Sequence, residues 1–303
     1  MAKVLFGDLE SVQSTSNTTE GIAYSIPKAL DHVQALQITG IFYRSPKHQV
    51  WGTAFEMTRR AIDAAARLAA DCSSNLLPTS ESGRNEMIDV CRASLVSYIM
   101  WESTVFYGRT SPLTYWTEQN HSWSLSQLEY SPHAFPTDRL LCQHVRLARL
   151  CERVAIEMGY CDPSNPGTST DYVMQQQMLR NALLDLRITV PQSLQQPSQL
   201  LFLFHVASVY IEEAVLHTST NGSSFTAPYL AERLSVTDFP KPVDPIQYTS
   251  AVYTLLEGAQ GALDTLSSLN SFEVTNLPGL IYAARAAYAL YILVKLYIAC
   301  TGA

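Results

Sequence analysis

The stretch LPGLIYAARAAYALYILVKLYIAC, residues 277–300, is the strongest indication of the fold of this chain. Pro278 suits the first turn of a helix, where its missing N–H is no loss. The apolar residues that follow occupy every side of the helical wheel, and such a helix is normally surrounded by neighbouring helices. About 20 residues would also cross a membrane. Arg285 and Lys295 argue against a membrane span, because a cation inside the bilayer costs several kcal/mol. We therefore predict the central, buried helix of a large helical domain and no membrane span.

The composition narrows the remaining choices. The chain has 303 residues, of which 47% are apolar and only 16% are charged, so much of it must be buried. Its net charge of −7 speaks against nucleic-acid binding, which needs clustered Lys and Arg. The six cysteines show no CxxC spacing, which indicates reduced thiols and no zinc site. The first ten residues carry no long apolar run, so we predict no signal peptide and an intracellular, cytoplasmic protein.

The period of the apolar residues predicts one all-α domain over residues 27–303, after a polar lead over residues 1–26. Strand-like alternation is not found, and we expect about seven to nine helices around the C-terminal one. Irregular segments are expected at 108–136 and 219–245. The helices are expected at 27–43, 51–71, 85–107, 137–159, 169–187, 199–218, 246–270 and from Pro278 onward.

Catalytic sequence motifs are missing from the chain. It contains no GxSxG, HExxH, P-loop or GxGxxG pattern, and no Cys–His spacing singles out a nucleophile. Glu212-Glu213 is the one adjacent acidic pair, and there is no DDxxD to hold Mg²⁺ and a diphosphate. We therefore predict neither a metal nor a cofactor.

The strongest remaining signal is a set of aromatic and polar residues within apolar helices, which is how cavities for apolar ligands are lined. His205, Glu213 and His217 fall within about a third of the helix circumference and can share one broad face. We take His205, Glu213 and Tyr107 as candidate catalytic residues. The candidate ligand-binding residues are Trp101, Tyr115, Trp116, Tyr210, His217, Tyr282 and Tyr288.

Each of these residues also has a purely structural explanation. A Trp or Tyr in a buried helix more often belongs to the core than to a pocket. A buried carboxylate such as Glu213 needs a cation, and Arg285 or Lys295 is the expected partner. His217 lies near a helix end, where the helix dipole favours it as a cap. The residues alone leave both explanations open.

Three segments resemble the regulatory, or middle homology, domain of fungal zinc-cluster transcription factors. They are YAARAAYA at 282–289 with LVKL at 293–296, VYIEEAVLH at 209–217, and Tyr98 to Trp101 followed by GRTSPL at 108–113. The chain departs from the family pattern at Thr110, where proline is usual, and at Thr114, where arginine is frequent. The resemblance covers most of residues 28–300 and implies an all-helical regulatory fold.

The family reads DNA through a cluster of closely spaced cysteines, but residues 1–71 contain no cysteine. We therefore expect no direct DNA binding by this chain. The first candidate function is binding of a small apolar metabolite with its cofactor-free cyclisation or cycloaddition in fungal secondary metabolism, which needs a shaped, dry pocket and a few polar groups. The second is a ligand-sensing domain or co-regulator, nuclear in that case. The third is a structural or inhibitory dimer partner, and a homodimer of the chain itself is a further expectation.

Overall fold

The computed structural model of this chain describes residues 26–42, 50–74, 80–109, 116–161, 171–191, 198–218, 220–230, 239 and 245–301. Residues 1–25 of the expected polar lead and the candidate Tyr115 lie outside the described residues.

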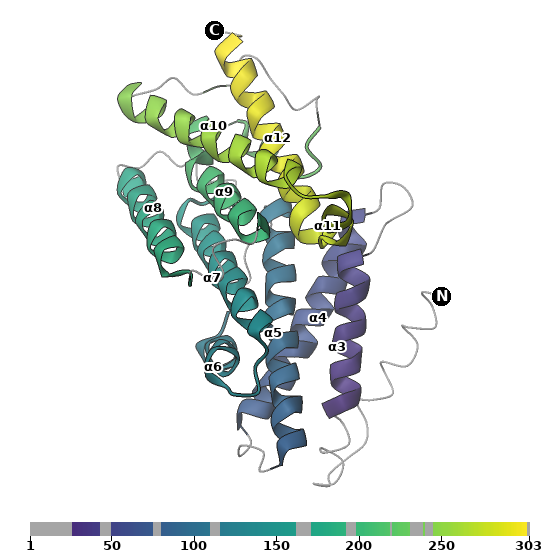
Figure 1. The fold of residues 1–303 in the computed structure, drawn as a ribbon. Helices are drawn as coiled ribbons and strands as arrows, with labels where there is room; N and C mark the ends of the chain where they lie inside the picture. The colour runs from purple at the N-terminus through teal and green to yellow at the C-terminus, as the bar shows by residue number, and fades with distance from the viewer. Residues whose placement is uncertain are drawn as a thin grey trace.

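Within the described ranges the secondary structure is entirely helical, which confirms the all-α prediction (Figure 1). Ten α-helices are present there, slightly more than the seven to nine expected. They are α3 (Ile26–Phe42), α4 (Val50–Ser74), α5 (Glu81–Gly108), α6 (Trp123–Tyr130), α7 (Pro136–Glu157), α8 (Asp171–Thr189), α9 (Ser198–Glu212), α10 (Pro245–Ser267), α11 (Ser271–Asn276) and α12 (Gly279–Thr301).

The long helices lie close to their predicted positions, and the differences concern short elements. The segment 108–136 contains a π-helical turn, Glu118–Ser122, followed directly by α6, so the prediction of irregular structure is wrong for residues 118–130. The segment 219–245 contains a short 3₁₀ turn, Gly222–Phe225. The helix expected over 199–218 changes from α to 3₁₀ geometry at Glu213–Leu216. This last change lies inside the candidate site.

The centre of the fold is α5, not α12. Helix α5 packs against α3, α4, α6, α7 and α12. Every residue from Ser97 to Tyr107 is buried, so neighbours surround this half of the helix. Ser80 caps its N-terminus by accepting the N–H of Gly83 at 3.1 Å. The C-terminal end of α5 therefore delivers its side chains to the deepest part of the molecule.

Helix α12 is covered on one side only, which corrects the prediction of a fully surrounded helix. Arg285, Tyr288 and Lys295 lie on the buried side, whereas Leu290 is 55% exposed and Tyr297 is 69% exposed. In Figure 1 the C-terminal half of α12 extends away from the other helices. The apolar wheel of this helix therefore includes a face that the described parts of the chain leave exposed.

Two segments, Ser198–Leu216 and Gly279–Thr301, are long and apolar enough to cross a membrane by length and composition. In the fold, 67% of the most apolar window of the first segment is buried, but only 39% of that of the second. The first is thus a core helix, as a mostly buried apolar helix of a globular domain is expected to be. The second remains partly open to its surroundings.

Candidate functional site

Arg109 ends α5 and directs its guanidinium into the interior. Its backbone adopts the left-handed conformation, with φ of 48°, and its N–H donates to the carbonyl of Val105 at 2.9 Å. This conformation is uncommon for residues other than glycine. The guanidinium carbon lies 4.6 Å from the ring centroid of Tyr210 and 5.0 Å from that of Tyr160. The side chain is 4% exposed, so the faces of these rings take the place of water.

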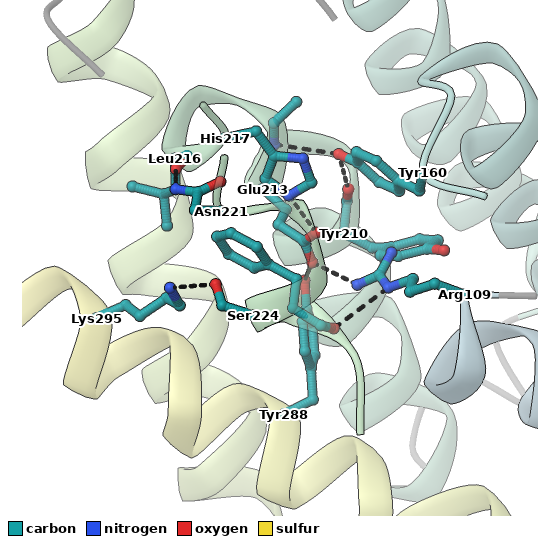
Figure 2. Close-up of polar contacts among 12 residues, drawn as sticks. Arg109, Tyr160, Tyr210, Glu213, Leu216, His217, Asn221, Ser224, Tyr288 and Lys295 are labelled. Atoms are coloured by element: carbon teal, nitrogen blue, oxygen red, sulfur yellow. Dashed lines mark hydrogen bonds and ion pairs between the residues drawn. The ribbon is translucent and has the colours of Figure 1, made fainter. Parts of the chain in front are cut away.

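Glu213 supplies the charge that this cation needs. Arg109 Nη2 lies 2.6 Å from Glu213 Oε2, and the hydroxyl of Tyr288 donates to the same oxygen at 2.5 Å. The second oxygen, Oε1, accepts from His217 Nε2 at 2.7 Å. Figure 2 shows the three donors reaching the carboxylate from α5, α12 and the chain beyond the 3₁₀ turn. Three parts of the chain therefore meet at one buried carboxylate.

The electrostatic balance keeps Glu213 ionised. Burial alone would raise the pKa of its carboxyl group, but the charge of Arg109 and the hydrogen bonds from His217 and Tyr288 outweigh burial, and the pKa lies below its ordinary value. The predicted partners of Glu213 were Arg285 or Lys295, and this prediction is wrong. A buried carboxylate does have a buried cation, but the cation comes from Arg109.

The adjacent Glu212 faces the other way. Its carboxylate accepts from Gln176 at 2.9 Å and pairs with Arg180, both on α8. The acidic pair therefore does not converge on one point, and among the described residues no group of three metal-binding side chains is brought together.

Tyr160 holds the place where α9 changes to 3₁₀ geometry. Its hydroxyl donates to the carbonyl of Tyr210 at 2.9 Å and accepts the N–H of Ala214 at 3.1 Å. These bonds satisfy two main-chain groups that the change of helix type leaves without partners. Nearby, Lys295 Nζ donates to Ser224 Oγ at 2.8 Å, as Figure 2 also shows. The local geometry that directs Glu213 inward is thus fixed from both sides.

A second buried ion pair lies about two turns earlier on α5, at Glu102. Arg285 Nη2 lies 2.6 Å from Glu102 Oε2, and its Nη1 donates to Ser103 Oγ at 2.9 Å. The same nitrogen lies 3.3 Å from the hydroxyl of Tyr107, which itself donates to the carbonyl of Leu280 at 2.7 Å. Burial raises the pKa of Glu102 to about 6, against the opposing charge of Arg285. This pair fixes the side of α5 against the start of α12.

In front of these two ion pairs the surface opens into a cleft of about 830 Å³. Its walls come from the end of α3, the chain at Ala227 to Tyr229, α11 and the first half of α12. Phe42, Tyr107, Tyr229 and Tyr282 are its aromatic lining. None of the described residues that line it carries a charge. The cleft lies within the 300–1,000 Å³ typical of small-molecule sites.

The ion pairs support the cleft from behind. The ring of Tyr229 lies 6.0 Å from that of Tyr288, centroid to centroid, and Tyr288 binds Glu213. The main chain joins the walls as well, because the N–H of Ala227 donates to the carbonyl of Tyr107 at 2.9 Å. Two walls of the cleft are therefore held from behind, whereas the buried hydroxyl of Tyr229 has no hydrogen-bond partner among the described residues.

The structure separates the residues predicted from sequence into three groups. Tyr107 and Tyr282 line the cleft. Tyr210, Glu213, His217 and Tyr288 form the buried network behind it. Two of the others pack elsewhere in the core: Trp101 lies 5.0 Å from Phe55 between ring centroids, and Trp116 stacks on His121 at 5.2 Å.

His205 does not join the other predicted catalytic residues. It is half-buried against α10, where a Cβ added at Gly261 would lie 2.5 Å from its ring. It precedes Glu213 by eight residues, about 12 Å along the helix. Burial and the charge of Arg187 lower the pKa of His205. His205, Glu213 and Tyr107 therefore do not converge on one reacting atom.

Sequence reasoning missed Arg109, Tyr229 and the small residues Gly279, Ala283 and Ala287, which make the cleft and its support. Arg109 follows a helix end and looked like part of a loop. Small residues carry no chemical signature in a sequence. Their role depends on what lies opposite them in the fold.

No family model, no curated protein and no solved structure matches this chain.

Proposed function

We propose that this protein binds a small, neutral, largely apolar molecule in the cleft between α3, α11 and α12. The observation that carries the proposal is the combination of a volume of about 830 Å³ with a lining free of charged side chains among the described residues. An uncharged cleft gives no compensation for the desolvation of an ionic ligand. Apolar surface, in contrast, gains about 25 cal/mol for each Å² removed from water.

The support behind the walls favours the same proposal. A site binds well when it is already formed, because ordering side chains on binding costs free energy. Tyr107 is held by Arg285 and the carbonyl of Leu280, and Tyr229 rests on Tyr288. The cleft therefore presents aromatic faces that do not need to be ordered by the ligand.

Cofactor-free cyclisation or cycloaddition of the bound molecule is the second candidate function. The aromatic walls favour it, because holding a flexible chain in a folded conformation removes much of the entropic barrier of such a reaction. The predicted catalytic set would not serve as a unit, since Glu213 is fully buried and His205 lies about 12 Å before it along the same helix, against α10. In this proposal Tyr107 and Tyr282 contribute through shape.

Ligand sensing within a transcriptional regulator, the function expected from the fungal family, needs the same cleft. Extraction of the molecule bound to the purified protein, followed by incubation of its precursors with fresh protein, separates the two functions. Product formed faster than in buffer indicates catalysis. Binding without conversion indicates sensing.

Filling the cleft tests the binding proposal directly. Gly279 lines the cleft, and a Cβ added there meets no atom within 4 Å, so Gly279→Trp places an indole in open space. We expect this variant to bind the neutral dye Nile red at least about tenfold more weakly, equivalent to about 1.4 kcal/mol, in a fluorescence titration.

Gly222→Trp is the matched control, because its Cβ also meets no atom within 4 Å but the residue lies outside the cleft. It should bind the dye as the unmodified protein does. Equal affinity of both variants, or no saturable binding by the unmodified protein, would contradict the proposal.

A further inference from the structure

The exposed face of α12 carries no charged residue, is apolar from Ala283 to Tyr297 and has a regular spacing. The two charged residues of this helix, Arg285 and Lys295, are both buried, at 4% and 3% exposure. Six of its exposed positions recur at intervals of four and three residues, which is the spacing of the contact seam between two paired helices; Gly279 and Cys300 are exposed as well. We call these six positions the α12 seam; they are Ala283, Ala287, Leu290, Val294, Tyr297 and Thr301.

An exposed face of this kind is unusual, because monomeric proteins seldom leave a long, contiguous apolar strip in water. The helix is as apolar as a core helix, but its neighbours cover it on one side only. The seam has the small Ala283 and Ala287 at its N-terminal end and one large ring, Tyr297, near its C-terminal end. This gradient specifies which arrangement of two copies would fit.

We propose that two copies of this protein pair through the α12 seam in an antiparallel arrangement about a two-fold axis. In this pairing Leu290 faces its own copy, and Ala283 faces Tyr297 of the partner subunit. Each large ring then meets a small residue, and packing by knobs into holes is possible along the whole seam. In a parallel pair the tyrosines would face each other at one end and the alanines at the other, which would crowd one end and leave a gap at the other.

A second copy fits this face better than a charged partner does, because the seam offers no ionic complement to one. The same surface patch on both subunits is what a two-fold dimer requires. Six positions of one helix make a small interface, at or below the about 1,200 Å² of total buried area typical of weak complexes. We therefore infer association in the micromolar range.

The pairing would also affect the cleft. Ala283 and Ala287 belong both to the seam and to the wall of the cleft. The ring of Tyr297 of the partner subunit would lie at the rim beside Ala283. This consequence rests on the proposed function, whereas the pairing itself does not.

Charge substitution at the two-fold axis is the test. Sedimentation velocity between about 1 and 100 μM should show the unmodified protein associating to a dimer. Leu290→Glu and Leu290→Lys should each be monomeric, because like charges would face each other across the axis. An equimolar mixture of the two variants should form the dimer again. Met174→Glu, at a 61% exposed position on α8, is the control and should dimerise normally.

The direction of pairing has its own measurement. In chains that lack the exposed Cys300, mixed Ala283→Cys and Tyr297→Cys proteins should form a mixed disulfide on mild oxidation. Disulfides between identical chains instead would overturn the antiparallel arrangement.

Several outcomes would overturn the pairing itself. They are an unmodified protein that stays monomeric, Leu290 variants that dimerise normally, or a mixture of the charged variants that stays monomeric. A monomer that instead sediments with neutral phosphatidylcholine vesicles would assign the seam to a lipid surface.

Discussion

Two fully buried carboxylates of this protein have opposite titration behaviour, and their donors explain why. Glu213 receives Arg109, Tyr288 and His217, and its pKa is lowered despite burial. Glu102 receives one arginine and lies near the like charge of Glu152, so burial dominates and raises its pKa to about 6. The number of donors that reach a carboxylate, rather than burial alone, sets its charge in the interior.

This difference predicts the effect of removing one charge. Glu213→Gln leaves the guanidinium of Arg109 buried without a counter-ion, and we expect a loss of about 3 to 5 kcal/mol in the free energy of unfolding. Tyr288→Phe removes one neutral donor and should cost about 1 to 2 kcal/mol. Urea denaturation followed by circular dichroism measures both. Equal losses for the two variants would show that the network is not organised by the Arg109–Glu213 pair.

At the site, the sequence predicted that Glu213 pairs with a cation but not which residue supplies that cation. The buried position of Glu213 follows from the apolar residues around it, and a cation was correctly expected. The choice between Arg285, Lys295 and Arg109 depends on contacts between residues more than 70 positions apart. Arg109 and Glu213 are 104 positions apart. No local pattern records such a contact.

Helices α9 and α10 approach each other closely where they cross, and two glycines allow it. A Cβ at Gly258 would lie 2.9 Å from the side chain of Val209 and 3.2 Å from the carbonyl oxygen of His205. A Cβ at Gly261 would meet the imidazole of His205 instead. Main chain cannot move aside, whereas a half-buried ring can rotate. The two glycines should therefore respond differently to the same change.

Gly258→Ala should lower the free energy of unfolding by about 1 to 3 kcal/mol, because it forces the two helices apart. Gly261→Ala should cost less, since rotation of His205 relieves the contact and alanine favours the helix by up to about 1 kcal/mol. Gly279→Ala, with open space around it, is the control and should be neutral or slightly stabilising. Thermal unfolding of the three variants ranks them. A larger loss for Gly261→Ala would contradict this account.

At the level of elements, the 3.6-residue period predicted the long helices within a few residues. Helices α6 and α11 have only eight and six residues, too few to form a periodic pattern. Short helices are marginal alone and depend on packing. The choice of central helix failed for a related reason. α12 is more apolar, but α5 buries Ser97, Glu102 and Ser103 by satisfying them with distant partners.

On the scale of the whole molecule, the cleft and the α12 seam lie on the same helix and share two residues. The buried side of α12 supplies Arg285 to one ion pair and the hydroxyl of Tyr288 to the other. Its first half lines the cleft, and its outer face carries the seam. Apolar residues on every side of this helix were interpreted from the sequence as a sign of full burial. They are also consistent with a helix that packs on the core, lines the cleft and carries the seam. A ligand in the cleft and a second copy on the seam would each cover surface that is exposed among the described residues.

The stability of the whole fold should also depend on pH in a defined direction. Burial lowers the pKa of His121 and His144 to about 4 from an ordinary value of 6.5. The unfolded chain then binds their protons in a window where the folded chain does not, so stability falls as pH drops from about 6.5 toward about 4. Glu102 acts oppositely, because its raised pKa makes the folded state the better proton acceptor between about 4.5 and 6.

Urea denaturation at several pH values between about 4.5 and 6 separates these contributions. The unmodified protein should become less stable as the pH falls. His121→Phe removes the group that takes up a proton on unfolding, so the free energy of unfolding should fall less steeply with falling pH, by about 1.4 kcal/mol per pH unit. Glu102→Gln should make this fall steeper by a similar amount. The slope should change in opposite directions in the two variants, because burial favours the unprotonated form of His121 but the protonated form of Glu102. A slope that neither variant changes would mean that His121 and Glu102 are open to solvent, and the buried ion pair behind the cleft would then have to be revised.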